Sequence, residues 1–138
     1  MTAMHDTAMA FFVTCETGKG WDGCKQHCRP EASFHCQADA LAKVTTLEGY
    51  CNWMQKLFTP MPDANYTLKS FVVDEPNHSA TAYAVFHGTH TGDGGPVPAT
   101  NLTTNSDYVY VMQFEGDKIS HMTKIWNAGW ALNELGWA

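Results

Sequence analysis

The second half of the chain alternates between apolar and polar residues, which is typical of strands with one buried face. The segments with this pattern are rich in Val, Thr, Tyr and Phe, and they span residues 66–74, 80–91, 105–115 and 118–127. The sequence Glu115-Gly116-Asp117-Lys118 predicts a tight turn between the last two segments, which should form an antiparallel hairpin. A second turn is expected at residues 75–78, so we predict an antiparallel meander.

The first half follows a helical pattern. Residues 5–17 predict a moderately apolar helix. Asp22 can cap a second, short helix that runs through the next residues to Pro30. Residues 34–36 predict a short extended piece.

A third helix is predicted after residues 45–48, whose Thr-Thr-Leu-Glu sequence fits a capping box. Pro60 should end this helix. Its spacing of i, i+3, i+4 and i+7 gives one apolar face, formed by Tyr50, Trp53, Met54 and Leu57.

A last short helix is predicted from Ala128 to Leu135, stopping at Gly136. Helices followed by an antiparallel meander predict an α+β fold, in which the N-terminal helices pack over one face of a curved sheet. A cavity between helices and sheet is where such a fold would hold a small ligand.

The two faces of the last hairpin differ in chemistry. The even-numbered positions are aromatic and methionine-rich, as in a ligand pocket or an ordinary core: Tyr108, Tyr110, Met112, Phe114, Ser120, Met122, Lys124 and Trp126. The odd-numbered positions, among them Val109 and Val111, form a flatter face that suits packing against another sheet. Lys124 does not fit an ordinary core, because a buried amine needs a partner or must lose its charge. Alternatively, Lys124 could reach water at the strand end.

Composition narrows the classes of partner. The 138 residues correspond to one domain over the whole chain. Charged residues make up 16%, which is low and indicates that some surface is buried in an oligomer. The net charge of −6, with Arg29 as the single arginine, excludes nucleic acid as a favoured partner. No apolar run is long enough to span a membrane, so no membrane partner is expected.

The cysteines bear on compartment and metal binding. Their odd number, five, argues against a disulfide framework and favours a cytoplasmic protein. The run Cys24, His27, Cys28, His35 and Cys36 could suggest zinc. No second compact ligand pair follows at a usual distance, so we expect buried thiols and no metal.

Several motifs together resemble the SnoaL-like polyketide cyclases of the nuclear-transport-factor-2-like superfamily, from the first helix to Gly136. They are Val85-Phe86-His87-Gly88-Thr89-His90-Thr91-Gly92, Pro96-Val97-Pro98, Glu115-Gly116-Asp117-Lys118-Ile119 and Leu132-Asn133-Glu134-Leu135-Gly136. The resemblance implies a cone-shaped α+β barrel, a homodimer joined through the sheet, and a closed apolar pocket without metal or cofactor. It also implies an intramolecular aldol ring closure that uses a His and an Asp on neighbouring strands.

Counting back from the Leu-Gly ending places the family's His position at Tyr110 and its Asp position at Lys124. A desolvated Lys has a lowered pKa and can act as a base or a Schiff-base nucleophile, while a Tyr hydroxyl can donate to an enolate oxygen. We therefore name Lys124, Tyr110 and His90 as candidate catalytic residues, although His90 could instead shape the exit of its strand.

The candidate substrate-binding residues are Trp53, Tyr50, Tyr108, Met112, Met122, Trp126 and His35. Trp53 and Trp126 are expected to face each other across the cavity. The sequence leaves three hypotheses: a cofactor-independent lyase or isomerase acting on a small apolar carbonyl compound, a non-catalytic small-molecule-binding dimer, and an assembly module that uses its sheet face.

Overall fold

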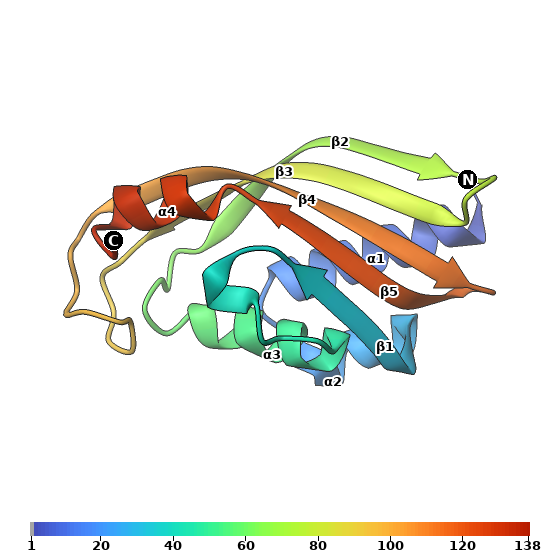
Figure 1. Cartoon of the computed structure of the whole chain (residues 1–138), viewed down its shortest axis with the longest axis horizontal. Coiled ribbons are helices and arrows are strands. Elements are labelled where there is room, and N and C mark those ends of the chain that lie inside the picture. Colours follow the sequence, from blue (N-terminus) through green and yellow to red (C-terminus); the bar gives the residue numbers. More distant parts are fainter. Residues whose placement is uncertain (1) are drawn as a thin grey trace.

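The computed structural model describes residues 2–138 and confirms the α+β class (Figure 1). The α-helices are α1 (Ala3–Glu16), α2 (Gly20–Cys24), α3 (Leu47–Leu57) and α4 (Ala128–Leu135), with short 3₁₀ turns at Lys25–His27 and Asp39–Leu41. The strands are β1 (Cys28–Cys36), β2 (Asn65–Asp74), β3 (Ser79–Thr89), β4 (Thr103–Glu115) and β5 (Lys118–Trp126).

The strands form one curled sheet in the order β1-β5-β4-β3-β2. Strands β2 to β5 are antiparallel neighbours, as the meander predicts. Strand β1, however, pairs parallel to β5, so the sheet is mixed and extends beyond the predicted antiparallel meander. No hairpin joins β1 to β5, and therefore no tight turn imposes an antiparallel pairing.

The segment around Pro30 is a strand where a helix was expected. Helix α2 ends at Cys24, and β1 begins at Cys28. Proline lacks a backbone N–H and disfavours helical backbone in the residue before it. From Ala32 onward every second side chain is buried, which places Phe34 and Cys36 inside the molecule.

Helix α3 is capped one residue later than predicted. The Thr46 hydroxyl accepts a hydrogen bond from the Gly49 N–H at 3.0 Å, so the cap is not the box formed by Thr45 and Glu48. The helix ends at Leu57, before Pro60, as expected.

The β4–β5 hairpin contains an irregularity that changes which residues face inward. The register shifts between Gln113 and Phe114, and Phe114 pairs with Ile119. Ile119 is therefore fully buried while Ser120 is only half-buried, the reverse of strict alternation. From Met122 onward the predicted even face does point inward.

Helices α1, α2 and α3 lie over the concave face of the sheet, and α4 lies at the other end near the C-terminus (Figure 1). The core between these layers includes Phe11 and Phe12 of α1, Tyr50 of α3 and the inner face of β4 and β5. Gly136 ends α4 with a φ of 73°, a left-handed conformation that favours glycine. No helix among residues 2–138 is long and apolar enough to cross a membrane.

Candidate functional site

Lys124 points inward from β5 into the space between the helices and the sheet. Its side chain is only 6% exposed. The Nζ atom donates a hydrogen bond to the Tyr50 hydroxyl at 3.0 Å, and Lys124 forms no ion pair with any residue from 2 to 138. The amine is thus held in the core by a hydroxyl and not by a carboxylate.

The sequence analysis missed Glu16, the last residue of α1, which is 4% exposed. Its carboxylate accepts one hydrogen bond from the Tyr108 hydroxyl and one from the Tyr110 hydroxyl. A signal was present in the sequence. Glu16 follows Phe12 by four positions and therefore lies on the same buried helix face.

These side chains form one continuous buried chain of hydrogen bonds. Lys124 donates to Tyr50, the hydroxyls of Tyr50 and Tyr110 are hydrogen-bonded to each other, and Tyr110 donates to Glu16. The chain joins an amine to a carboxylate through two phenols that can each give and accept a proton. It crosses α1, α3, β4 and β5.

Burial brings the protonation equilibria of the two ends closer together. Desolvation lowers the pKa of Lys124 to about 8, although the negative charge of Glu16 opposes this shift. Desolvation likewise raises the pKa of Glu16, against the positive charge of Lys124 and the two phenol hydrogen bonds. Burial also raises the pKa of Tyr50 and Tyr110, so both phenols stay protonated at neutral pH.

Aromatic rings surround the amine of Lys124. The distances from Nζ to the ring centroids are 4.6 Å for Trp126, 5.0 Å for Tyr50, 5.4 Å for Trp53 and Tyr108, and 6.0 Å for Tyr110. Aromatic faces attract a cation at such distances. The rings therefore offset part of the desolvation cost of a positive charge on this nitrogen, without a direct counter-ion.

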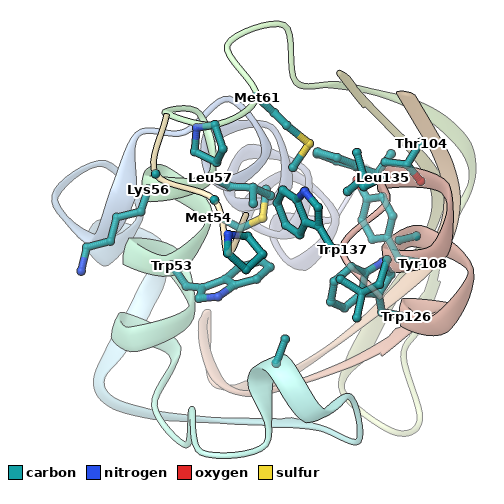
Figure 2. A pocket seen from close by; sticks show the side chains of 18 of the residues that line it. Trp53, Met54, Lys56, Leu57, Met61, Thr104, Tyr108, Trp126, Leu135 and Trp137 are labelled. Atoms are coloured by element: carbon teal, nitrogen blue, oxygen red, sulfur yellow. The ribbon is translucent and has the colours of Figure 1, made fainter. Parts of the chain in front are cut away.

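The two ends of this chain line a mainly apolar chamber of about 420 Å³. Figure 2 shows Trp53 and Leu57 of α3 on one side and Tyr108 and Trp126 of the sheet on another, with Trp137 between them. Lys56 extends away from the other side chains, so its charge does not enter the chamber (Figure 2). Glu16 and Lys124 are then the charged groups that the chamber presents to a ligand.

The structure separates the predicted substrate-binding residues into two groups. Trp53, Tyr108 and Trp126 line the chamber, and the rings of Trp53 and Trp126 face each other at 6.0 Å in an edge-to-face arrangement. The other group lies deeper: Tyr50, Met112 and Met122 are fully buried and do not line the chamber.

His35 does not point into the chamber, and that expectation is wrong. Its neighbour Phe34 is the inward-facing residue of β1, so alternation places His35 outside, where its side chain is exposed. It lies instead beside a second depression at the β1–β5 edge, together with Gln37 and Thr123.

His90 is fully buried behind the chamber wall and does not line the chamber. Its Nδ1 atom accepts a hydrogen bond from the Trp137 indole at 2.9 Å, and Trp137 does line the chamber. Gly95 packs so closely on the imidazole that a Cβ atom there would lie 2.8 Å from Nε2. His90 thus contacts the C-terminal indole of Trp137 and the backbone at Gly95, and it does not reach the chamber.

Cys24, Cys28 and Cys36 of the cysteine–histidine run are buried, as the sequence analysis expects, but the run does not form a cluster. Among residues 2–138, the group of three possible metal ligands whose atoms lie within 4.8 Å of one another is Cys15, Cys24 and Cys51. These thiols come from α1, α2 and α3, they are buried, and none of them lines the chamber. Spacing along the chain therefore did not identify the cysteines that meet in space.

Comparison with solved structures supports this fold. IdmH from Streptomyces antibioticus, proposed as a polyketide cyclase, is 20% identical, with a TM-score of 0.76 over 96% of this chain and 98% of its own. BvnE pinacolase from Penicillium brevicompactum is 14% identical, with a TM-score of 0.71 over 95% and 87%. A protein of ketosteroid isomerase-like fold from Catenulispora acidiphila is 13% identical, with a TM-score of 0.70 over 96% and 93%. These identities establish a shared fold.

No curated protein sequence gives a significant match to this chain. The family model of the SnoaL-like polyketide cyclases matches residues 6–134, from within α1 to within α4. The chain therefore belongs to the SnoaL-like polyketide cyclase family.

Proposed function

We propose that this protein catalyses cofactor-independent enolisation chemistry, of the aldol cyclase or isomerase type, on a small apolar carbonyl compound. The observation that carries the proposal is the buried chain from Lys124 through Tyr50 and Tyr110 to Glu16, whose two ends open onto an apolar chamber. Membership of a family named for polyketide cyclases supports a carbonyl substrate.

The two charged ends of the chain have complementary roles. Enolisation needs a base that removes a proton from the carbon next to the carbonyl, and the Glu16 carboxylate is the acidic group on the chamber wall. It also needs a group that activates the carbonyl oxygen or carbon. Lys124 lines the chamber, and its amine has N–H groups beyond the one that Tyr50 accepts.

Hydrogen–deuterium exchange at the α-carbon provides the test. When apolar aldehydes and ketones are incubated in D₂O and followed by NMR, their α-hydrogens should exchange for deuterium faster with the protein than without it. Glu16→Gln should slow this exchange by about 10²–10⁴-fold, the usual contribution of a positioned base. Glu48→Gln, a change at an exposed position of α3, should have no effect. No acceleration across the panel, or a fully active and folded Glu16→Gln protein, would contradict the proposal.

A second candidate function is non-catalytic binding of a small molecule, favoured by the apolar lining from Trp53, Tyr108 and Trp126. It predicts that a ligand is carried through purification and is visible by native mass spectrometry. Trp53→Ala should then weaken binding of an apolar fluorescent probe. An empty protein that binds no probe would contradict this candidate.

We further propose that the active form is a homodimer joined through the outer sheet face in a reducing cytoplasm. Support comes from large apolar side chains exposed on this face, Val72 (55%), Tyr83 (36%) and Ile125 (62%), and from five free thiols. Light scattering after size exclusion should give twice the chain mass of 15.3 kDa, and Ile125→Lys should shift it toward the monomer.

A further inference from the structure

The position of Lys124 raises the question of how it activates a carbonyl group. Lys124 lines the chamber, it forms no ion pair with a carboxylate among residues 2–138, and its hydrogen bond to Tyr50 uses one of its N–H groups. A Lys that only provided charge to the fold would be expected to pair with a buried carboxylate, yet Glu16 is bound by two phenols instead.

Building on the proposed enolisation function, we infer that Lys124 acts as a covalent nucleophile whose Nζ condenses with an aldehyde or an unhindered ketone to form an imine. The carbon–nitrogen bond forms as the carbonyl π bond breaks, and the carbonyl oxygen takes up the proton that the attacking nitrogen loses. The resulting carbinolamine then loses this oxygen as water, which needs one further proton. The Glu16 carboxylate then removes the α-proton from the iminium to give an enamine. The enamine carbon attacks a second carbonyl, whose oxygen takes this proton back from Glu16. Water finally adds to the new iminium, which releases the product as a carbonyl compound and restores the amine.

The hydrogen-bonded chain supplies the proton movements that this sequence requires. An ammonium cannot attack a carbonyl, so Lys124 must first give up a proton. That proton can pass to Tyr50 as Tyr50 passes its own to Tyr110 and Tyr110 passes its own to Glu16. Glu16 then holds the proton that the departing water takes. Burial lowers the pKa of the amine to about 8 and raises the pKa of Glu16, which favours this internal transfer.

The aromatic rings around Nζ stabilise the cationic intermediate. An iminium carries its positive charge at the same nitrogen as the ammonium, within 4.6–6.0 Å of the Trp126, Tyr50, Trp53, Tyr108 and Tyr110 rings. The same surroundings therefore fit both the resting amine and the intermediate, without movement of a counter-ion.

This mechanism restricts the substrate class. Aldehydes and unhindered ketones form imines, whereas carboxylates and esters do not take this route to an enamine. The chamber of about 420 Å³ and its apolar lining select one small apolar molecule. For ring closure, that molecule carries the imine-forming carbonyl and a second carbonyl within reach of the enamine carbon.

Reductive trapping tests this inference directly. The full chain is incubated with 3-phenylpropanal and sodium cyanoborohydride near neutral pH, and intact-mass and peptide analysis locate the secondary amine. Labelling should concentrate at Lys124. Its neutral fraction at pH 7 exceeds that of an ordinary Lys on the order of 10²-fold, given a pKa of about 8. Lys124→Met should abolish this label, and Lys56→Met, at the exposed chamber rim, should retain it.

The dependence of labelling rate on pH separates a nucleophile from a merely accessible amine. The rate at Lys124 should level off above about pH 8, while the rates at surface lysines keep rising. Tyr50→Phe should slow labelling at Lys124 and shift that inflection. Labels spread evenly over surface lysines, or labelling unchanged in Lys124→Met, would overturn the inference. If the wild-type protein catalyses deuterium exchange but no imine can be trapped at Lys124, the enolisation proposal stands and only the imine inference is overturned.

Discussion

Tyr110 donates a hydrogen bond to the carboxylate of Glu16, although 94 positions separate the two residues in the chain. Tyr108 donates to the other carboxylate oxygen, so both oxygens are occupied. The end of the first helix is thereby fixed to the inner face of β4. A buried carboxylate without such donors would be costly, because a charge removed from water needs compensation.

The first prediction concerns this bond. Tyr110→Phe should lower the free energy of unfolding by about 1–3 kcal/mol, since it leaves one buried acceptor on Glu16 without its donor. The matched control is Tyr66→Phe, which changes a half-buried tyrosine that packs on the same Phe12 ring. Denaturant titrations should show a clearly smaller loss for the control. Equal losses would mean that the bond to Glu16 contributes no specific stability.

The second prediction concerns pH and Lys124. The folded pKa of about 8 lies below the unfolded value, so the contribution of this group is fully present above the unfolded pKa. It is lost as the pH falls through about 8. Relative to Lys124→Met, the wild-type protein should therefore lose about 2–3 kcal/mol between about pH 10 and about pH 6.

Denaturant titrations of both proteins across this pH range measure the difference. Lys56→Met, at an exposed position of α3, should track the wild type at every pH. Parallel stability curves for the wild type and Lys124→Met would show that the amine is solvated.

The third prediction concerns the C-terminal wall of the chamber. Trp137→Phe keeps an aromatic ring but removes the indole donor to His90, and we expect a loss of about 1 kcal/mol. Trp130→Phe alters a tryptophan that is 56% exposed and should change little. Thermal melts of both variants provide the measurement. If Trp137→Phe leaves the stability unchanged, the hydrogen bond to His90 does not stabilise this wall of the chamber.

The fourth prediction distinguishes two caps for α3. Thr46→Ala removes the hydroxyl that accepts from the Gly49 N–H and should lower stability by about 1 kcal/mol. Thr45→Ala changes an exposed side chain in the capping box expected from the sequence, and it should be close to neutral. The opposite order in unfolding experiments would favour that box.

Most of the sheet was predictable from local pattern. The strands β2 to β5 and helix α4 fall within two residues of their expected bounds, because alternation and turn residues act over a few positions. Of the strand β1, only residues 34–36 were predicted as extended, since Pro30 and Glu31 interrupt its pattern and its parallel partner β5 is distant in the sequence. The inward direction of Lys124 followed from alternation in the same way.

The candidate site was harder to predict than the fold. Tyr110 and Lys124 share the inner face, yet the amine binds Tyr50 of α3, because helix packing decides which phenol reaches Nζ. An acidic residue at the end of a helix resembles a solvent-facing one, so Glu16 went unnoticed. His35 was misplaced because the phase of β1 was not known. The grouping of Cys15, Cys24 and Cys51 was not predicted, because these thiols come from three different helices.

The chain of hydrogen bonds from Lys124 to Glu16 requires every layer of the molecule to be docked at once. If the helices loosened from the sheet, both ends would return to water and titrate as ordinary side chains. The pKa of Lys124 therefore reports whether the helices and the sheet are packed as in the native state. A compact but molten form of this protein would keep its secondary structure, while the pKa of Lys124 would return toward its ordinary value.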